Sequence, residues 1–121
     1  MITVKATREG LVGGMTASGW IIDTTTPFVA LPSHKALGRK VQVVNPLNGL
    51  SVIAEVKDVG PWNVHDDEYV FGGARPAAED GKSLSGVGTN GAGIDLGEAV
   101  WRILDMQDNT DVSWEFVETG D

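Results

Sequence analysis

The sequence contains no cysteine and is poor in aromatic and basic residues. Without cysteine, disulfide frameworks, thiolate nucleophiles and thiolate metal sites are excluded, while the redox compartment stays open. Four tryptophans, three phenylalanines and one tyrosine stand against sixteen glycines, which favours a small, turn-rich, mainly β core. Nine basic against seventeen acidic residues give a net charge of -8. That charge disfavours nucleic acid and anionic membrane surfaces as partners.

Long hydrophobic runs are also missing. No apolar stretch reaches the roughly eighteen residues of a membrane span, and the first ten residues lack the apolar segment of a secretion signal. We therefore expect either a chain made without a signal, such as a phage or phage-like particle component, or an exported chain whose signal was removed. The expected locations are the cell envelope, the periplasm, the extracellular space or a virion. With 121 residues and 41% apolar content, a single domain over 1–121 is predicted.

Hydrophobic patterning predicts a β-barrel with one helix. Alternation of apolar and polar residues, or short apolar runs, predict strands at 2–8, 20–22, 28–31, 40–45, 50–59 and 112–116. Asn48-Gly49 predicts a type I′ hairpin turn. Apolar residues at helical spacing predict a helix over 96–106. The segment 60–92 is long and poor in apolar residues, which is typical of a functional loop.

The sequence contains partial matches to nucleotide-binding and metal-binding motifs, but neither has the surrounding features that such a site requires. The GVGTNG sequence at 86–91 matches a dinucleotide pattern, but no strand precedes it. His34 and His65 lack the HxH or HxxxH spacing of a metal site. We therefore expect neither a metal nor a cofactor.

Asp58 is the first candidate for acid–base chemistry. It shares strand parity with Val52, Ala54 and Val56, so its side chain is expected on the buried face at a strand end. Partial burial favours the protonated form of a carboxyl, as a general acid requires. The alternative is that Asp58 only accepts hydrogen bonds from turn amides near Gly60.

Asp95 is the second candidate. With Glu98 three residues later, it fits the N-cap of a helix in a capping box, and capping alone could explain it. A helix N-terminus beside Asp95 would hold its carboxylate ionised, while Asp58 in an apolar mouth would stay protonated. With these two environments, Asp58 would act as the acid and Asp95 as the base.

A series of short motifs occurs in one order along the chain: TASG at 16–19, SHKAL at 33–37, VQVVN at 41–45, NG at 48–49, DVGP at 58–61 and IDL at 94–96. This order resembles the double-psi β-barrel of rare lipoprotein A. The resemblance covers about residues 16–104. It implies a mainly β, six-stranded double-psi β-barrel related to expansins, barwin-like endoglucanases and membrane-bound lytic transglycosylase A.

The resemblance also implies a function and its residues. The aspartate and histidine that act in rare lipoprotein A enzymes match Asp58 and His34, and Asp95 matches the catalytic acid of related barrels. The implied reaction is cleavage of the β-1,4 bond between muramic acid and glucosamine in peptidoglycan, without metal or cofactor. If Asp58 and Asp95 lie roughly 6.5–9.5 Å apart, hydrolysis with inversion is feasible, and one competent carboxyl would favour intramolecular transfer. A local hydrogen-bonding role for His34 stays open.

The sequence departs from that family at the groove. Trp20 replaces the glutamate after TASG, and Val59 replaces the loop arginine, and both changes favour a different choice of substrate. We expect Trp20, Trp62 and Tyr69 to stack on sugar rings, while Trp101 and Trp114 belong to the core. The remaining predicted substrate contacts are Thr16, Asn63 and Arg75. Arg75 would pair with a carboxylate of the glycan, or it is an ordinary solvated arginine.

The leading hypothesis is a peptidoglycan-cleaving enzyme of the lytic transglycosylase or muramidase kind. The rival is a non-catalytic glycan-binding or structural barrel, for example in a phage tail with other particle proteins as partners. The missing glutamate after TASG and the charge of -8, unfavourable for binding an anionic polymer, both favour the rival.

Overall fold

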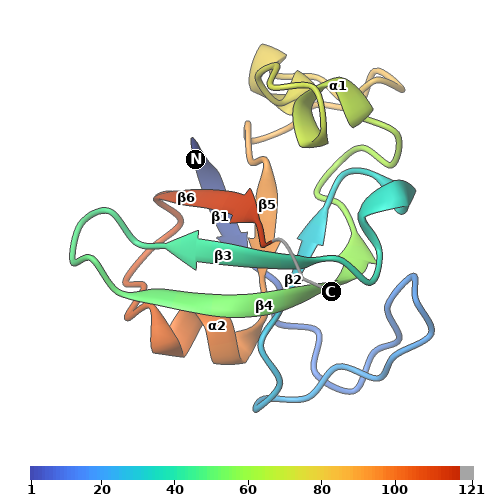
Figure 1. The fold of residues 1–121 in the computed structure, drawn as a ribbon. Helices are drawn as coiled ribbons and strands as arrows, with labels where there is room; N and C mark the ends of the chain where they lie inside the picture. The colour runs from blue at the N-terminus through green and yellow to red at the C-terminus, as the bar shows by residue number, and fades with distance from the viewer. Residues whose placement is uncertain (118–121) are drawn as a thin grey trace.

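The computed structural model describes residues 1–117 as a closed barrel of six strands (Figure 1). Around the barrel the strand order is β1-β5-β2-β4-β3-β6. The strands are β1 (Ile2–Arg8), β2 (Phe28–Leu31), β3 (Lys40–Val44), β4 (Ser51–Val59), β5 (Ile94–Leu96) and β6 (Asp111–Phe116). The sheet is mixed, because β1 pairs with β5 and β2 with β4 in parallel while the other pairs are antiparallel. The predicted six-stranded, mainly β fold is confirmed.

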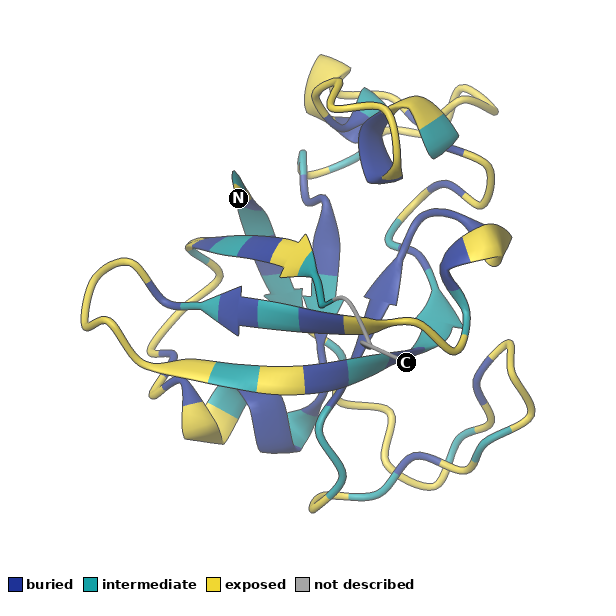
Figure 2. Ribbon diagram, viewed as in Figure 1, coloured by how far each residue is buried: buried dark blue, intermediate teal, exposed yellow. Residues whose placement is uncertain are grey.

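The alternation that predicts β1 reflects its burial. Val4 and Ala6 point into the core, and the intervening threonine and lysine side chains face outward. Trp114 on β6 is buried as predicted, and its indole N–H donates to the Tyr69 hydroxyl, which donates to the Gly93 carbonyl. Figure 2 shows buried residues alternating with less buried ones along β3. Trp101 is partly buried against this core.

The single predicted helix is shorter than expected. α2 runs over Glu98–Ile103 only, because Leu96 belongs to β5, where it pairs with Val29 and Arg8. Gly97 separates strand from helix and donates its N–H to the Phe28 carbonyl. A three-residue strand enclosed by glycines gives too short a pattern to be recognised in the sequence.

The predicted hairpin between β3 and β4 is present, but its turn is not type I′. The last pair is Val44 with Ser51, so six residues connect the strands, and of the Asn48-Gly49 pair only Gly49 has a positive φ. The Asn45 and Asn48 side-chain amides both donate to the Leu104 carbonyl. The loop is therefore shaped by its bonds to the end of α2.

The two long excursions lie at different ends of the barrel in Figure 1. Residues 9–27 contain only an isolated bridge between Met15 and Ile21, so the strand predicted at 20–22 is wrong. The segment 60–92 is not a bare loop, because it forms α1 (Asp67–Val70) and the 3-10 helix η2 (Ala77–Asp80). A second 3-10 helix, η1 (His34–Ala36), follows β2.

Candidate active site

Four residues on neighbouring strands form one row across the barrel wall. Thr7 of β1 pairs with Asp95 of β5, Asp95 pairs with Ala30 of β2, and Ala30 pairs with Asp58 of β4. Directly paired residues point to the same face of a sheet. The two aspartates, 37 positions apart in the sequence, are thus two strand spacings apart, about 10 Å between Cα atoms.

This row faces outward, which corrects the predicted direction of Asp58. Val29 pairs with Val56 but Ala30 pairs with Asp58, so β4 carries one extra residue at Lys57. Such a bulge switches the parity of the strand beyond it. Asp58 therefore lies on the opposite face from Val56 and is half-buried at the surface.

Asp95 is held in β5 and does not cap α2, whose N-cap is Gly97. The Thr7 hydroxyl donates a hydrogen bond to Asp95 Oδ1. Burial raises the pKa of Asp95 to about 6, the Thr7 bond opposes this rise, and the nearby charge of Asp58 adds to it. The expectations of a capping box and of a carboxylate held ionised by a helix N-terminus are both wrong.

The turn formed by 16–19 positions Asp58. The Ala17 N–H donates to Asp58 Oδ1 at 2.8 Å, and the Val59 N–H donates to the same oxygen at 2.9 Å. The Ser18 hydroxyl binds the Lys57 carbonyl at 2.7 Å and ties the turn to β4. Asp58 thus accepts amide hydrogen bonds, as the structural alternative predicted, while keeping its place in the row.

Thr16 supports this turn from inside. Its side chain is buried, its Oγ1 accepts from the Trp20 N–H and is hydrogen-bonded to the Ser18 hydroxyl. The predicted contact between Thr16 and a substrate is therefore replaced by a role in holding the turn.

Glu9 is a third carboxyl that sequence reasoning missed. Its N–H donates to the Leu96 carbonyl, so it extends the pairing of β1 with β5 by one residue. Two residues after Thr7, it continues the outward face of β1. Burial raises the pKa of Glu9 to about 9, helped by a hydrogen bond with Asp58 and by the charges of Asp58 and Asp95. The signal was the alternation of polar residues at 3, 5, 7 and 9.

Among residues 1–117, no hydrogen bond or ion pair joins the His34 side chain to the carboxyl cluster, by which we mean Glu9, Asp58 and Asp95. It is exposed on η1, with its ring 5.2 Å from the ring of His65. Both hydrogen bonds that Asp58 Oδ1 accepts come from backbone amides, those of Ala17 and Val59. The expected pairing of His34 with Asp58 is not found.

Two tryptophans are close in the sequence to residues that contact the cluster. Trp62 stands two residues after Gly60, where an added Cβ would lie 3.6 Å from Asp95 Oδ2. Its side chain is 44% exposed, and its indole N–H donates to Asn90 Oδ1. Trp20 is half-buried, packs edge-on against Phe28 and lies under the Lys57 ammonium. Of the predicted stacking residues, Trp62 offers the open face.

The other predicted substrate contacts are occupied within the protein. Tyr69 is only 2% exposed and belongs to the core, so it presents no face to a sugar. Asn63 is buried, and its Oδ1 accepts from the Leu84 N–H. Arg75 is exposed, but its guanidinium forms a bidentate ion pair with the Glu79 carboxylate.

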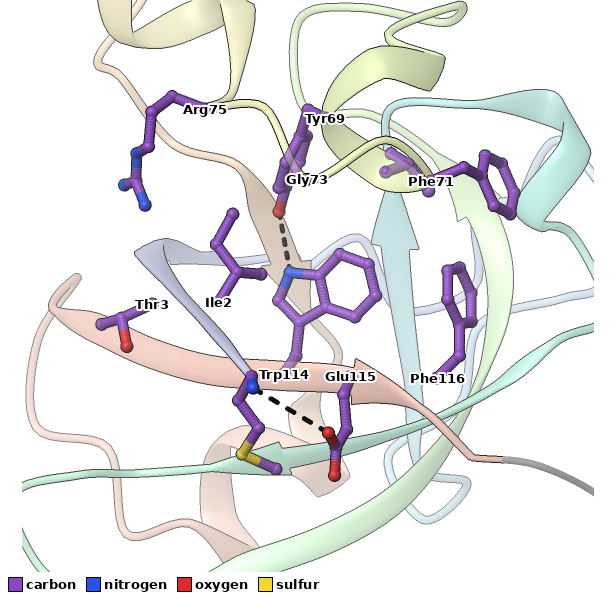
Figure 3. A pocket seen from close by; sticks show the side chains of 11 residues that line it. Ile2, Thr3, Tyr69, Phe71, Gly73, Arg75, Trp114, Glu115 and Phe116 are labelled. Atoms are coloured by element: carbon purple, nitrogen blue, oxygen red, sulfur yellow. Dashed lines mark hydrogen bonds and ion pairs between the residues drawn. The ribbon is translucent and has the colours of Figure 1, made fainter.

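A pocket lies elsewhere on the protein. It has a volume of about 580 Å³ and lies between α1 and the start of β1, with Trp114, Phe71 and Phe116 in its wall (Figure 3). None of the carboxyl cluster lines it.

Within residues 1–117, no group of three or more histidine and carboxylate side chains is arranged to hold a metal ion. Over the same range, no helix has the length and apolarity to span a membrane.

Solved structures share this fold. The Streptomyces papain inhibitor is 21% identical with a TM-score of 0.56, and the match covers 97% of this chain and 94% of that one. An expansin from Clavibacter michiganensis is 20% identical in its apo form, with a TM-score of 0.57. A variant of that expansin in complex with cellohexaose gives a TM-score of 0.54. This chain spans 52% of the expansin's length.

These neighbours are double-psi β-barrels, so the fold expected from the resemblance is confirmed. No curated protein matches the chain. A family model described as "Domain of unknown function (DUF8814)" matches residues 1–115. The chain therefore belongs to the DUF8814 family, and it folds as a closed six-stranded double-psi β-barrel.

Proposed function

We propose that this protein cleaves the glycan strands of peptidoglycan, with Asp95 as the general acid and Asp58 as its anionic partner. The observation that carries the proposal is the outward row in which Asp95 and Asp58 flank Ala30. A pKa of about 6 leaves Asp95 largely protonated in mildly acidic conditions, while it can still release its proton readily. Paired carboxyls with different environments are what glycosidic cleavage uses.

The chemistry balances with these two groups alone. Asp95 gives its proton to the glycosidic oxygen, which leaves as the hydroxyl of the departing sugar. Asp58 accepts a proton either from a water molecule that attacks the anomeric carbon or from a hydroxyl of the same sugar. The first path gives a hydrolysed end, and the second gives an anhydro sugar without consuming water.

The choice of substrate has two supports. Trp62 is an exposed aromatic residue two positions after Gly60, which lies next to Asp95, and a flat aromatic face suits the C–H groups of a pyranose ring. The expansin of the same fold was solved in complex with cellohexaose, a β-1,4-linked glycan. Peptidoglycan has this linkage and is the substrate that the motif order resembling rare lipoprotein A implies. The proposal places the protein in the cell envelope, outside the cell or on a phage particle, with particle proteins as further partners.

Incubation with purified sacculi tests the proposal. Wild type is expected to release soluble muropeptides, and mass spectrometry of their ends distinguishes hydrolysed from anhydro products. Asp95→Asn is expected to abolish release. The matched control is Asp80→Asn, which removes the same charge from an exposed site on η2. Equal release by wild type and Asp95→Asn would contradict the role given to Asp95.

The second candidate is a glycan-binding module without turnover. It is favoured by the position of the cluster, because Glu9, Asp58 and Asp95 line none of the three pockets of about 580, 540 and 180 Å³. Pull-down on insoluble peptidoglycan, chitin and cellulose separates the two functions. Retention without released products supports the module, and Trp62→Ala should then reduce retention. Leu47→Ala is the control, because Leu47 is an exposed apolar residue of the hairpin loop.

A further inference from the structure

One asparagine joins a lysine of β1 to a tryptophan of the segment 60–92. The Trp62 indole N–H donates to Asn90 Oδ1 at 2.9 Å. The Lys5 ammonium donates to the backbone carbonyl of the same Asn90 at 3.1 Å. Asn90 Oδ1 also accepts the Ala92 N–H at 3.0 Å, which holds the asparagine side chain in place. An aromatic ring and a cation that are far apart in the sequence are thus each one hydrogen bond from a single residue.

Lys5 lies on the same face of β1 as the row that contains the proposed acid. It precedes Thr7 by two residues, so both side chains point outward. The Gly93 N–H donates to the Lys5 carbonyl, and Thr7 pairs with Asp95 two residues further along both strands. Two strand residues span about 7 Å, a separation that a single glycan strand can cover. A sugar bound at Lys5 would therefore be close to the sugar that Asp95 acts on.

The ammonium of Lys5 has hydrogen-bonding capacity left for a ligand. Within residues 1–117 it forms no ion pair, not even with Asp111, its cross-strand neighbour on β6. An ammonium has three donors, and the hydrogen bond to the Asn90 carbonyl uses one of them. Hydrogen bonds from a cation are strongest to an anionic acceptor such as a carboxylate. Lys5 is only partly buried, so a carboxylate can approach it.

Trp62 is held in a tight turn that leaves its side chain at the surface. The Asn63 N–H donates to the Pro61 carbonyl at 2.8 Å, which closes a γ-turn in which Trp62 has a φ of 69°. A positive φ is unusual for so large a residue and persists where the surroundings hold it. Buried Asn63 accepts the Leu84 N–H and so fixes the turn. The bond to Asn90 fixes the indole ring, and Trp62 is nevertheless 44% exposed.

From these contacts we infer that Lys5, Trp62 and Asn90 form a subsite for a sugar unit that carries a carboxylate. Trp62 stacks on the pyranose ring, the Lys5 ammonium pairs with the carboxylate, and Asn90 is a positioning residue for both. In peptidoglycan the carboxylate belongs to the lactyl group of muramic acid or to the stem peptide attached to it. The inference rests on the proposed function and adds the recognition of the muramic acid unit to it.

The subsite also bears on charge. The chain has a net charge of -8, which repels an anionic polymer at a distance. A lysine beside the proposed acid attracts the same polymer locally, where the sugar must be placed. It therefore predicts a preference for a carboxylate-bearing glycan over a neutral one of the same linkage.

Binding of soluble tetrasaccharides to Asp95→Asn protein, which should leave the ligands intact, tests the subsite. The ligands are chitotetraose, the peptidoglycan tetrasaccharide with free lactyl groups, and the same tetrasaccharide with stem peptides. Adding Lys5→Met removes the ammonium and keeps an unbranched side chain. It should weaken a carboxylate-bearing ligand about threefold to tenfold and leave chitotetraose unchanged. Lys40→Met, at an exposed site on β3, is the matched control.

The ligand that responds identifies the carboxylate. Weaker binding of the tetrasaccharide with free lactyl groups assigns the lactyl carboxylate, and weaker binding of only the peptide-bearing ligand assigns the stem peptide. The inference is overturned if Lys5→Met has no more effect than Lys40→Met, if it weakens chitotetraose equally, or if no ligand binds. If wild type releases no muropeptides from sacculi, the proposed function fails separately, and these affinities still decide for or against the subsite.

Two variants of Asn90 test its positioning role. Asn90→Ala removes the acceptor of the indole N–H and should weaken chitotetraose as well as the charged ligands, as Trp62→Ala should. Asn90→Asp keeps an oxygen acceptor at the same place and should recover most of the chitotetraose binding. If folded Asn90→Asp binds chitotetraose as weakly as Asn90→Ala, the bond to Trp62 does not position the ring.

Discussion

At the scale of single residues, the cluster shows how environment divides roles among chemically similar side chains. Burial raises the pKa values of both Asp95 and Glu9, but Thr7 donates a hydrogen bond to Asp95 that opposes the rise of its pKa. Glu9 instead has a second carboxyl as its partner, which adds to the rise. The result is one carboxyl suited to exchanging a proton near pH 6 and one suited to retaining it.

The Thr7 hydroxyl should set the pH at which cleavage falls. Its bond stabilises the ionised form of Asp95, so Thr7→Val should raise the pKa of Asp95 above about 6. The fall of the cleavage rate with rising pH should then move to higher pH. Thr3→Val is the control. Thr3 lies on the same outward face of β1 as Thr7, but its hydroxyl is hydrogen-bonded to Ser113 and not to a carboxyl of the cluster. A fall that stays in place or moves to lower pH would contradict the role of Thr7.

Stability should also depend on Glu9. Its pKa is raised from 4.5 to about 9, so between these values the folded protein binds a proton that the unfolded chain has lost. The contribution is fully present below about pH 4.5 and is lost as pH rises through about 9. Denaturant unfolding should show the free energy of unfolding falling from pH 6 to 9 in wild type and falling less in Glu9→Gln. Identical slopes would refute the raised pKa.

The roles of some site residues can be predicted from the sequence, and the roles of others cannot. Asp58 and Asp95 emerged from the order of short motifs, because backbone-linked signals such as DVGP and IDL are local. Tyr69 and Asn63 were misassigned as substrate contacts, since an aromatic or amide side chain looks alike in a groove and in a core. Glu9 was missed because its significance depends on Asp58, which is 49 positions away in the sequence.

At the scale of elements, one bulge and one short strand determine the site. The extra residue in β4 turns Asp58 to the outer face, and β5 places Asp95 in the same row. Neither feature has a strong local pattern, so the sequence predicted a buried Asp58 and a helix-capping Asp95 instead. The five strands with clear alternation or apolar runs, β1 to β4 and β6, agree with the predicted ranges to within one residue at each end.

The step from β5 to α2 should tolerate no side chain at Gly97. A Cβ there would lie 2.3 Å from Phe28 Cε1, which forces ring or backbone to move. Gly97→Ala should lower the free energy of unfolding by about 1–3 kcal/mol. Gly88→Ala is the matched control, because nothing lies within 4 Å of its added Cβ. Urea denaturation compares the two, and equal stability of the variants would refute the close packing.

At the scale of the whole molecule, the fold follows from many weak signals that agree. The ordered motifs predicted a closed double-psi barrel, and the strand order confirms it although no single tetrapeptide is specific. The net charge of -8 belongs to this scale as well, because it acts on a polymer at a distance. Peptidoglycan carries negative charge, so protein and proposed substrate repel each other.

Salt should therefore promote the reaction. Raising ionic strength from low values to about 0.15 M shortens the screening length to about 8 Å. KM for sacculi should fall over this range, while kcat changes little. Uncharged chitin oligosaccharides serve as the control ligand, whose binding should be insensitive to salt. A KM for sacculi that rises with salt would mean that attraction between opposite charges dominates binding.

The pH dependence of muropeptide release from sacculi tests the central claim most directly. With Asp95 as the acid, release by wild type should be high below about pH 6, fall as the pH rises through that value, and be absent at every pH in Asp95→Asn. Release that is unchanged across pH 6, or that persists in folded Asp95→Asn, would contradict the account.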